Sequence, residues 1–387
     1  MRAQYLRKSI VITCITCLLI LAAAPAWAQT IKIGVAAPFT GPAASYGENI
    51  KSGVETKVAE INAAGGINGM RVQAVYFDEL CDPKEAATVA PRIARDKDIV
   101  GAVGHVCSSA HLAALPTYVR MGLPIISPTA TNVTIGDQNA DRAGRIWSFR
   151  NVYLDDYQGY FLARYVKEVL GLSRIAVFYE NNDYGIGLKD AFVKEADNIG
   201  LTIVGSEGYV KGTTDFTPQL TRLRGGNPDG LFISGYYNEG ALIAAQAGNL
   251  GMNVVKFGAD GLDNVDYINL AGDAANNTYM TVPFLAAAAP EAAREFIRTF
   301  EETYKRDLDW MSANAYDAVG LLAAAVTAVG PDRAKIRDYL ADIDTPEKAY
   351  VGITGPTYFN AKGDPAKMAF IKMVKDGAFT AAPKQME

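Results

Sequence analysis

The sequence predicts an α/β protein built on doubly wound parallel sheets, because strand-like and helix-like segments alternate along the chain. Short apolar runs such as 99–103 (IVGAV) are typical of parallel strands buried on both faces. Segments of helical period separate these runs, as at Ile50, Val54 and Val58. One set of such units precedes residue 151 and a second set follows it, which predicts two sheets.

The bounds of each element follow from the glycines, prolines and polar clusters that interrupt the apolar pattern; Gly65-Gly66 and Gly122, for example, end helices. We expect strands at 31–36, 72–77, 99–103, 124–127, 145–150, 174–179, 201–204, 230–234, 254–258 and 279–284. Between them we expect helices that begin near Tyr46 and at 84–95, 110–119, 160–169, 188–199, 216–223 and 241–250. The last part predicts helices at 290–304, 312–329 and 332–343, then strands at 357–360 and 368–374 around a turn at 362–364.

The first 28 residues have the features of a secretory signal peptide. A basic start precedes an apolar stretch at 10–24, and Ala26-Trp27-Ala28 matches the small-x-small cleavage pattern. An uncleaved membrane anchor is the alternative, although the apolar stretch is short for a membrane span. We expect cleavage after Ala28 and export to the periplasm.

The composition of the chain argues against several classes of function. The chain has 37 Lys and Arg against 42 Asp and Glu, and without the three basic residues of the signal peptide its net charge is −8. Such a charge argues against nucleic acid or an anionic membrane as a partner. The sequence has two histidines and lacks phosphate-loop, G-x-S-x-G and H-E-x-x-H motifs, so we expect no enzyme, no metal and no cofactor.

Two cysteines remain after the signal peptide, Cys81 and Cys107, which lie 26 positions apart. In an oxidising compartment such a pair is most simply a disulfide. A pair of reactive thiols is the alternative.

Two hydroxyl-rich loops follow neighbouring strands of the first set. Ser108 stands at a helix start, where free N–H groups attract an anion, and Thr129 and Thr131 lie in the next loop. Both loops belong to the carboxyl edge of the sheet, where ligands of open α/β sheets bind, and neither contains an acid or base. They suit a carboxylate that is held without being transformed, although solvated turns with a capping serine would look the same. Tyr46 is a surface aromatic or a wall of the same cleft.

The second set places Tyr184, Tyr236 and Asp260 at the ends of its strands. Two such edges facing each other would form a cleft with anion-binding loops on one wall and a carboxylate on the other. That polarity suits a zwitterion. A turn or helix-capping aspartate is the alternative for Asp260.

A series of short motifs runs in one order from residue 31 to beyond residue 260: IKIGVAAPFTGP with YGEN, INAAGGING, DELCDPK, GHVCSS, PIISPTAT, LDDYQG, DYGIGL, GYYNE and GADG. With this series the chain resembles the periplasmic branched-chain amino acid (Leu/Ile/Val) substrate-binding proteins of ATP-binding cassette importers. The resemblance implies a type I periplasmic binding protein, with two Rossmann-like lobes joined by a three-crossing hinge and the ligand in the interlobe cleft. It implies an N-terminal lobe of 29–153 plus 284–368 and a C-terminal lobe of 154–283 plus 369–387.

The resemblance also implies roles for single residues. Ser108 and Thr131 would bind the α-carboxylate, Thr129 would offer its backbone, and Asp260 would pair with the α-ammonium. Tyr184 and Tyr236 would wall the closing lobe, Tyr46 the side-chain pocket, and Asp155 matches an aspartate beside the hinge; the Cys81–Cys107 disulfide is a family feature. The chain departs from the family in two places: Asp260 stands where glutamate is usual, and Ala313 and its neighbours lack a bulky aromatic stretch, which leaves a larger pocket or one lined by Met311.

The function implied by the resemblance is the capture of an amino acid, branched-chain or otherwise aliphatic, by hinge closure and its delivery to the membrane permease of an importer. We expect a monomer. One alternative is a receptor for another small carboxylate or amide, such as an aromatic acid, that serves a transporter or a sensor. The enzymatic alternative is an amino-acid racemase with one thiol on each side of the cleft, but both cysteines fall in the first lobe.

Overall fold

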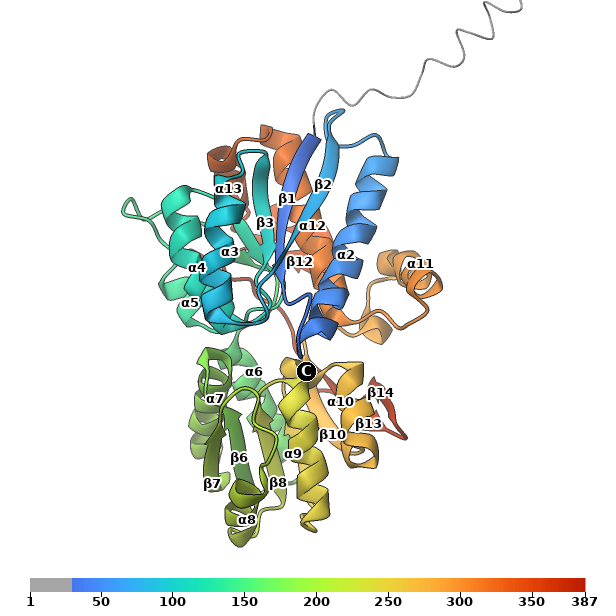
Figure 1. The fold of residues 1–387 in the computed structure, drawn as a ribbon. Helices are drawn as coiled ribbons and strands as arrows, with labels where there is room; N and C mark the ends of the chain where they lie inside the picture. Colours follow the sequence, from blue (N-terminus) through green and yellow to red (C-terminus); the bar gives the residue numbers. More distant parts are fainter. Residues whose placement is uncertain (1–29, 387) are drawn as a thin grey trace, which may run out of the picture.

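The computed structural model describes residues 30–386, so the predicted signal peptide lies outside the described residues. Figure 1 shows two lobes, one above the other, each built around its own sheet. The predicted α/β class with parallel sheets is confirmed.

The first lobe contains a five-stranded sheet of order β2-β1-β3-β4-β5, in which all the pairings are parallel. Its strands are β1 (Thr30–Ala37), β2 (Arg71–Asp78), β3 (Ile99–Gly104), β4 (Ile125–Ser127) and β5 (Ser148–Arg150). Its helices are α2 (Ala44–Ala63), α3 (Pro83–Arg95), α4 (Ser108–Met121), α5 (Thr134–Asp137), α11 (Arg294–Tyr304), α12 (Trp310–Val329) and α13 (Arg333–Asp342). Helix α2 packs against α12, and α3 packs against α4. Helix α12 is apolar and long enough to span a membrane, but it is mostly buried, as a core helix is.

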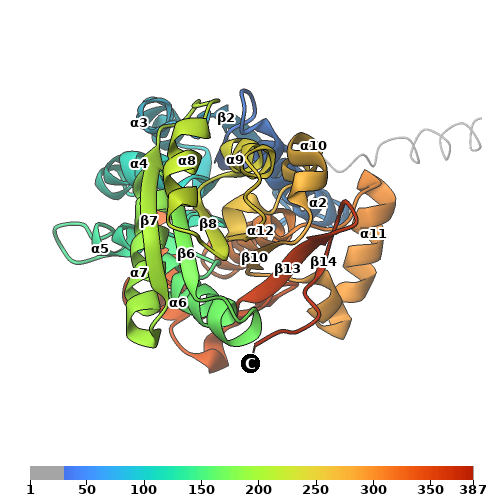
Figure 2. The same ribbon diagram turned by 90° about the horizontal axis from the view of Figure 1, so that it is seen from below.

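The second lobe contains a seven-stranded sheet of order β14-β13-β10-β9-β8-β6-β7, seen from below in Figure 2. Its strands are β6 (Arg174–Glu180), β7 (Thr202–Tyr209), β8 (Gly230–Ser234), β9 (Val255–Gly258), β10 (Thr278–Val282), β13 (Phe370–Lys375) and β14 (Ala378–Ala381). Its helices are α6 (Asp155–Arg164), α7 (Asp183–Ile199), α8 (Thr217–Gly225), α9 (Tyr237–Asn249) and α10 (Val265–Ala271). The chain passes between the lobes three times: after β5, after β10 and before β13.

Two helices of the second lobe begin five residues earlier than predicted. Helix α7 starts at Asp183 instead of 188, and α6 starts at Asp155 instead of 160. Asn182 caps α7, since its side chain accepts a hydrogen bond from the Gly185 N–H at 2.8 Å. Polar starting residues of this kind precede the apolar periodicity, which is why periodicity alone placed both starts too late.

The predicted strand at 145–150 is shorter than expected, because β5 covers only its last three residues. Asp141 accepts hydrogen bonds from the side chains of Arg145, at 2.8 Å, and Trp147, at 3.1 Å. These bonds hold the residues before β5 in a loop.

The C-terminal part differs most from the prediction. The strand expected at 357–360 is wrong beyond Thr357, because β12 (Gly355–Thr357) pairs with β11 (Tyr350–Gly352) in a separate two-stranded sheet. The strand expected at 368–374 exists as β13, but it joins the second sheet antiparallel to β10 and pairs with β14, which was not predicted. The pairing of β13 with β10 joins distant segments and leaves no local pattern. The β13–β14 hairpin is local, and its Asp376-Gly377 turn was a hairpin signal that the sequence offered.

Candidate functional site

A narrow cleft lies between the two lobes at the carboxyl ends of strands from both sheets, as open α/β sheets lead one to expect. Its lining consists of Tyr46, Val106, Ser108, Thr129, Tyr184, Tyr236, Asp260, Gly261, Trp310 and Met311. Six of the eight predicted site residues are among them. The other two, Thr131 and Asp155, are not among these residues but adjoin each other, since the Asp155 N–H donates to the Thr131 carbonyl at 3.0 Å.

Hydroxyls and helix N–H groups form the wall of the cleft on the first lobe. Ser108 is the first residue of α4, where the first N–H groups have no partner within the helix. The buried Thr131 hydroxyl makes no hydrogen bond within residues 30–386. The Thr129 hydroxyl instead donates to the Val106 carbonyl at 2.9 Å, and the Thr129 N–H donates to the Ser127 hydroxyl at 3.4 Å, so both groups support the loop. This wall can bind a carboxylate.

Arg150, at the end of β5, holds the loop that contains Thr129 and Thr131. It is 1% exposed and donates to the carbonyl of Asn132 at 2.6 Å and to that of Ala130 at 3.3 Å. Its guanidinium also pairs with Asp364, whose Oδ1 accepts hydrogen bonds from Nε at 2.8 Å and from Nη2 at 2.5 Å. Arg150 was not among the predicted site residues; the available signal was an arginine at the end of a predicted strand.

The predicted disulfide joins Cys81 and Cys107, with 5.5 Å between the Cα atoms. Cys107 is the N-cap residue of α4, so the bond anchors the helix start that presents Ser108. Both cysteines are buried. The disulfide therefore lies beside the cleft and supports it.

We expect the double variant Cys81→Ser/Cys107→Ser to lose roughly 3–4 kcal/mol of unfolding free energy, because the loop it opens is no longer closed in the unfolded chain. Urea denaturation with and without reductant measures this loss. Reductant should destabilise the wild type and leave the variant unchanged; equal midpoints for variant and oxidised wild type would contradict the prediction.

Asp260 is the carboxylate in the cleft. It is 3% exposed, and its Oδ1 accepts a hydrogen bond from the Tyr184 hydroxyl at 2.7 Å. Its Oδ2 is buried and has no hydrogen-bond partner in the described part of the chain. Burial raises the pKa of Asp260 to about 8, so the free protein holds a proton there at neutral pH.

A second buried acid lies near Asp260. Asp155 is 1% exposed, and its Oδ1 accepts a hydrogen bond from Gln158 Nε2 at 2.8 Å. Gln158 in turn accepts a hydrogen bond from the Thr281 hydroxyl at 2.9 Å. Burial raises the pKa of Asp155 to about 7. Asp260 in the lining and Asp155 near it are therefore acids that can pair with a cationic group once they release their protons.

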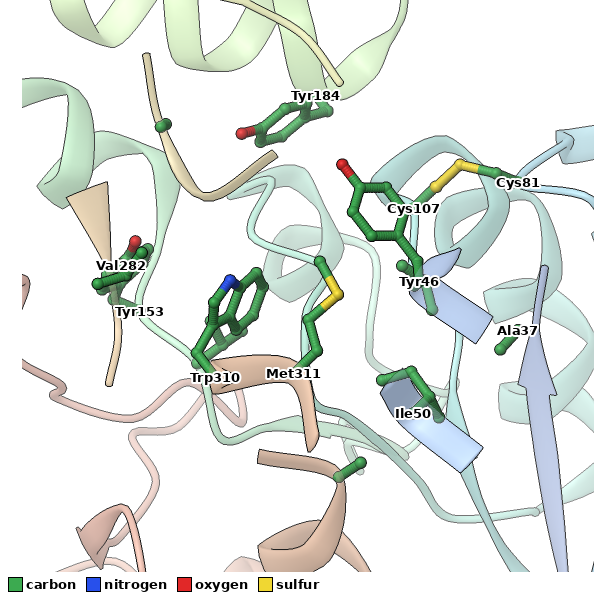
Figure 3. Close-up of a cluster of buried hydrophobic side chains, with 14 of the residues drawn as sticks. Ala37, Tyr46, Ile50, Cys81, Cys107, Tyr153, Tyr184, Val282, Trp310 and Met311 are labelled. Atoms are coloured by element: carbon green, nitrogen blue, oxygen red, sulfur yellow. A yellow bond between two sulfur atoms is a disulfide. The ribbon is translucent and has the colours of Figure 1, made fainter. Parts of the chain in front are cut away.

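Aromatic side chains close the cleft. Tyr184 and Tyr236 stack with ring centroids 4.9 Å apart, and Tyr46 meets Tyr236 edge-on at 6.0 Å. Figure 3 shows Trp310 and Met311, the first residues of α12, on the side of the cleft opposite Tyr184. Met311 therefore lines the site, as one of the two alternatives for the missing aromatic stretch around Ala313 predicted. Trp310 was not predicted as a site residue, although an aromatic residue before an apolar helix was visible in the sequence.

Hydrogen bonds cross the cleft on both sides. The Tyr46 hydroxyl donates to the Gly261 carbonyl at 2.5 Å, and the Tyr237 hydroxyl donates to the Pro42 carbonyl at 2.8 Å. Lys211 Nζ donates to the Leu80 carbonyl at 2.8 Å. These bonds, together with the small space left between the lining side chains, describe a closed conformation.

Within residues 30–386 there is no group of three or more His, Cys, Asp and Glu side chains arranged to hold a metal ion. Both histidines serve the core instead. His105 Nε2 pairs with the Tyr118 hydroxyl at 2.9 Å, and His111 Nε2 pairs with the Ser148 hydroxyl at 2.8 Å.

Comparison with known proteins extends this description. A family model described as periplasmic binding protein matches residues 30–378. The leucine-, isoleucine-, valine-, threonine- and alanine-binding protein of Pseudomonas aeruginosa is 31% identical over 87% of each chain, and the Leu/Ile/Val-binding protein of Escherichia coli is 31% identical over 88% of this chain and 89% of its own. The structure of the branched-chain amino acid transporter substrate-binding protein of Streptococcus pneumoniae in complex with isoleucine has a TM-score of 0.83 and 30% identity, over 91% of this chain and 98% of that one.

Proposed function

This chain belongs to the periplasmic binding protein family, and from this premise we propose that it captures an α-amino acid between its lobes and delivers it to an ATP-binding cassette importer. The relatives reported above are named as binding proteins for branched-chain amino acids and, in one case, also for threonine and alanine, which supports an aliphatic or other small amino acid as the ligand. They are solute-binding proteins rather than enzymes, and both cysteines are consumed in one disulfide, so the racemase alternative is set aside.

The observation that carries the proposal is the buried Oδ2 of Asp260, which has no hydrogen-bond partner in residues 30–386 and lies in the same cleft as the helix start at Ser108. An α-ammonium would pair with this oxygen, while Ser108 and Thr131 would hold the α-carboxylate. An ion enclosed between two lobes is strongly unfavourable unless it is paired, so both walls are needed at once. Ligands that lack either charged group would leave one wall unsatisfied.

Closure of the cleft would be the conformational change that the importer recognises. The hydrogen bonds from Tyr46 and Lys211 span both lobes, and they can form only when the lobes approach each other. A ligand that bridges the two walls adds further contacts to the closed state alone, and therefore shifts the equilibrium toward it. The importer would then distinguish loaded from empty receptor by shape.

A thermal-shift screen of ligand-stripped protein tests the proposal. A ligand present at 100 times its dissociation constant stabilises the folded state by about 2.7 kcal/mol, so tight binders are readily detected. We expect shifts with small neutral amino acids. Shifts only with aromatic acids or amides, which have no α-ammonium, would keep a receptor function but overturn the assignment of Asp260.

Amino-acid affinity should rise with pH, by up to about tenfold per pH unit below pH 8, because ligand binding must remove the proton from Asp260. In the ligand-free protein the pH dependence of folding stability has the opposite sign. Its folded state holds more protons than the unfolded chain between about pH 4 and pH 8, so stability falls as pH rises through this window. Calorimetric titrations between pH 6 and 8 check the first effect, and the same affinity at both ends would contradict it.

The processing, location, oligomeric state and lobe division of the chain are also proposals. We infer cleavage after Ala28, a periplasmic location and a monomer, which intact-mass measurement and light scattering of exported protein would check. We also retain the lobes 29–153 plus 284–368 and 154–283 plus 369–387, a division supported by the three passages between the sheets.

A further inference from the structure

One polar group in the cleft has no part in binding the head group of an amino acid: the indole N–H of Trp310. Trp310 is 2% exposed, lines the cleft and begins α12. Its Nε1 has no acceptor anywhere in residues 30–386. Figure 3 shows this nitrogen on the edge of the ring that is turned toward Tyr184, across the cleft.

The acceptors near the start of α12 are already engaged. Asp309 accepts the Ser312 N–H at 2.9 Å through Oδ1, and through Oδ2 it accepts Arg306 at 2.5 Å and the Ser312 hydroxyl at 2.6 Å. The second oxygen of Asp260 is free, but the proposed α-ammonium needs it. A buried donor without an acceptor is costly, and native proteins rarely leave one.

Resting on the proposed function, we propose that Trp310 is a specificity-determining residue whose N–H donates to an oxygen on the ligand's side chain. The preferred ligands are then amino acids with a hydroxyl or amide side chain, ahead of aliphatic amino acids of the same size. An anionic side chain is disfavoured because Asp155 and Asp260 already lie buried in the site. A cationic side chain offers no acceptor to an N–H group.

Threonine and valine form the matched pair of ligands that tests this inference, since they differ by a hydroxyl in place of a methyl group. Asparagine and leucine form a second pair of greater length. The variant Trp310→Phe removes the N–H and keeps an aromatic ring. Trp147→Phe is the control variant, because the Nε1 of Trp147 donates to Asp141 at 3.1 Å outside the cleft.

Calorimetry on the stripped wild type should show the polar member of at least one pair bound about tenfold or more tightly than its aliphatic partner. In Trp310→Phe this ratio should fall close to one, with weaker binding of the polar ligand and unchanged or tighter binding of the aliphatic ligand. Trp147→Phe should keep the wild-type ratio. If Trp310 had a purely structural role, Trp310→Phe would weaken the binding of both ligands equally.

Two results would overturn the inference while leaving the proposed function intact. One is a wild type that binds the aliphatic member of both pairs at least as tightly, as expected if a water molecule satisfies the indole N–H. The other is a ratio that Trp310→Phe does not change. If no amino acid binds to folded protein, the proposed function itself fails, and this inference fails with it.

Discussion

Asp260→Asn should weaken amino-acid binding by roughly 100-fold or more, because it leaves the α-ammonium enclosed without its counter-charge. Asparagine has nearly the size of aspartate and can keep a bond to the Tyr184 hydroxyl, so the change isolates the charge. The ligand-free variant should be at least as stable as the wild type near pH 8, since it no longer contains a buried ionisable carboxyl group. Calorimetry with the best ligand from the thermal-shift screen measures the loss.

The matched control is Asp342→Asn on α13, where the carboxylate is 75% exposed and pairs with Lys348 at the surface. This variant should bind like the wild type. The pH dependence of affinity should also flatten in Asp260→Asn and persist in the control. An Asp260→Asn protein with near-wild-type affinity would remove Asp260 from the ligand site.

Asp364→Asn should destabilise the protein by roughly 3–5 kcal/mol, because the Arg150 guanidinium, 1% exposed, would lose its counter-ion without gaining water. The expected fall in melting temperature is about 5–10 °C. Ligand affinity should fall as well, since Arg150 holds the loop that contains Thr131 through the carbonyls of Ala130 and Asn132. Differential scanning calorimetry and ligand titration measure the two effects.

Asp137→Asn is the matched control for this effect, because Asp137 pairs with Lys362 only two residues from Asp364 and both side chains are more than half exposed. It should cost less than about 1 kcal/mol. The double variant Arg150→Met/Asp364→Leu should recover most of the stability lost in Asp364→Asn, since it leaves no unpaired ion. Equal melting temperatures for Asp364→Asn and Asp137→Asn would contradict the role given to the buried pair.

The candidate site shows how far reasoning from sequence reached. Ser108, Thr129 and Asp260 were predicted because each follows a buried strand, and the ends of parallel strands meet at one edge of a sheet. All three line the cleft. The use of the Thr129 hydroxyl as a loop support was not predictable, because its acceptor, the Val106 carbonyl, belongs to another loop.

Residues whose role depends on distant partners were missed. Arg150 matters because it meets Asp364, 214 positions away, and Trp310 matters because α12 packs on α2 and brings its first turn to the cleft. Both lie at the ends of elements that were predicted correctly in kind. An arginine at a strand end and an aromatic residue before an apolar helix were visible in the sequence, but neither indicates a binding site by itself.

The α/β class, the alternation of strands and helices, and the polar character of the loops at the strand ends could all be predicted without the structure. These properties follow from local periodicity and from the short-range preferences of the backbone. The folded structure was needed to show that β13 pairs antiparallel with β10, and which buried polar groups find partners and which, such as Asp260 Oδ2 and Trp310 Nε1, stay free. The physical reason is that hydrogen bonds and ion pairs between distant segments form only when the whole chain has folded, so no local pattern records them.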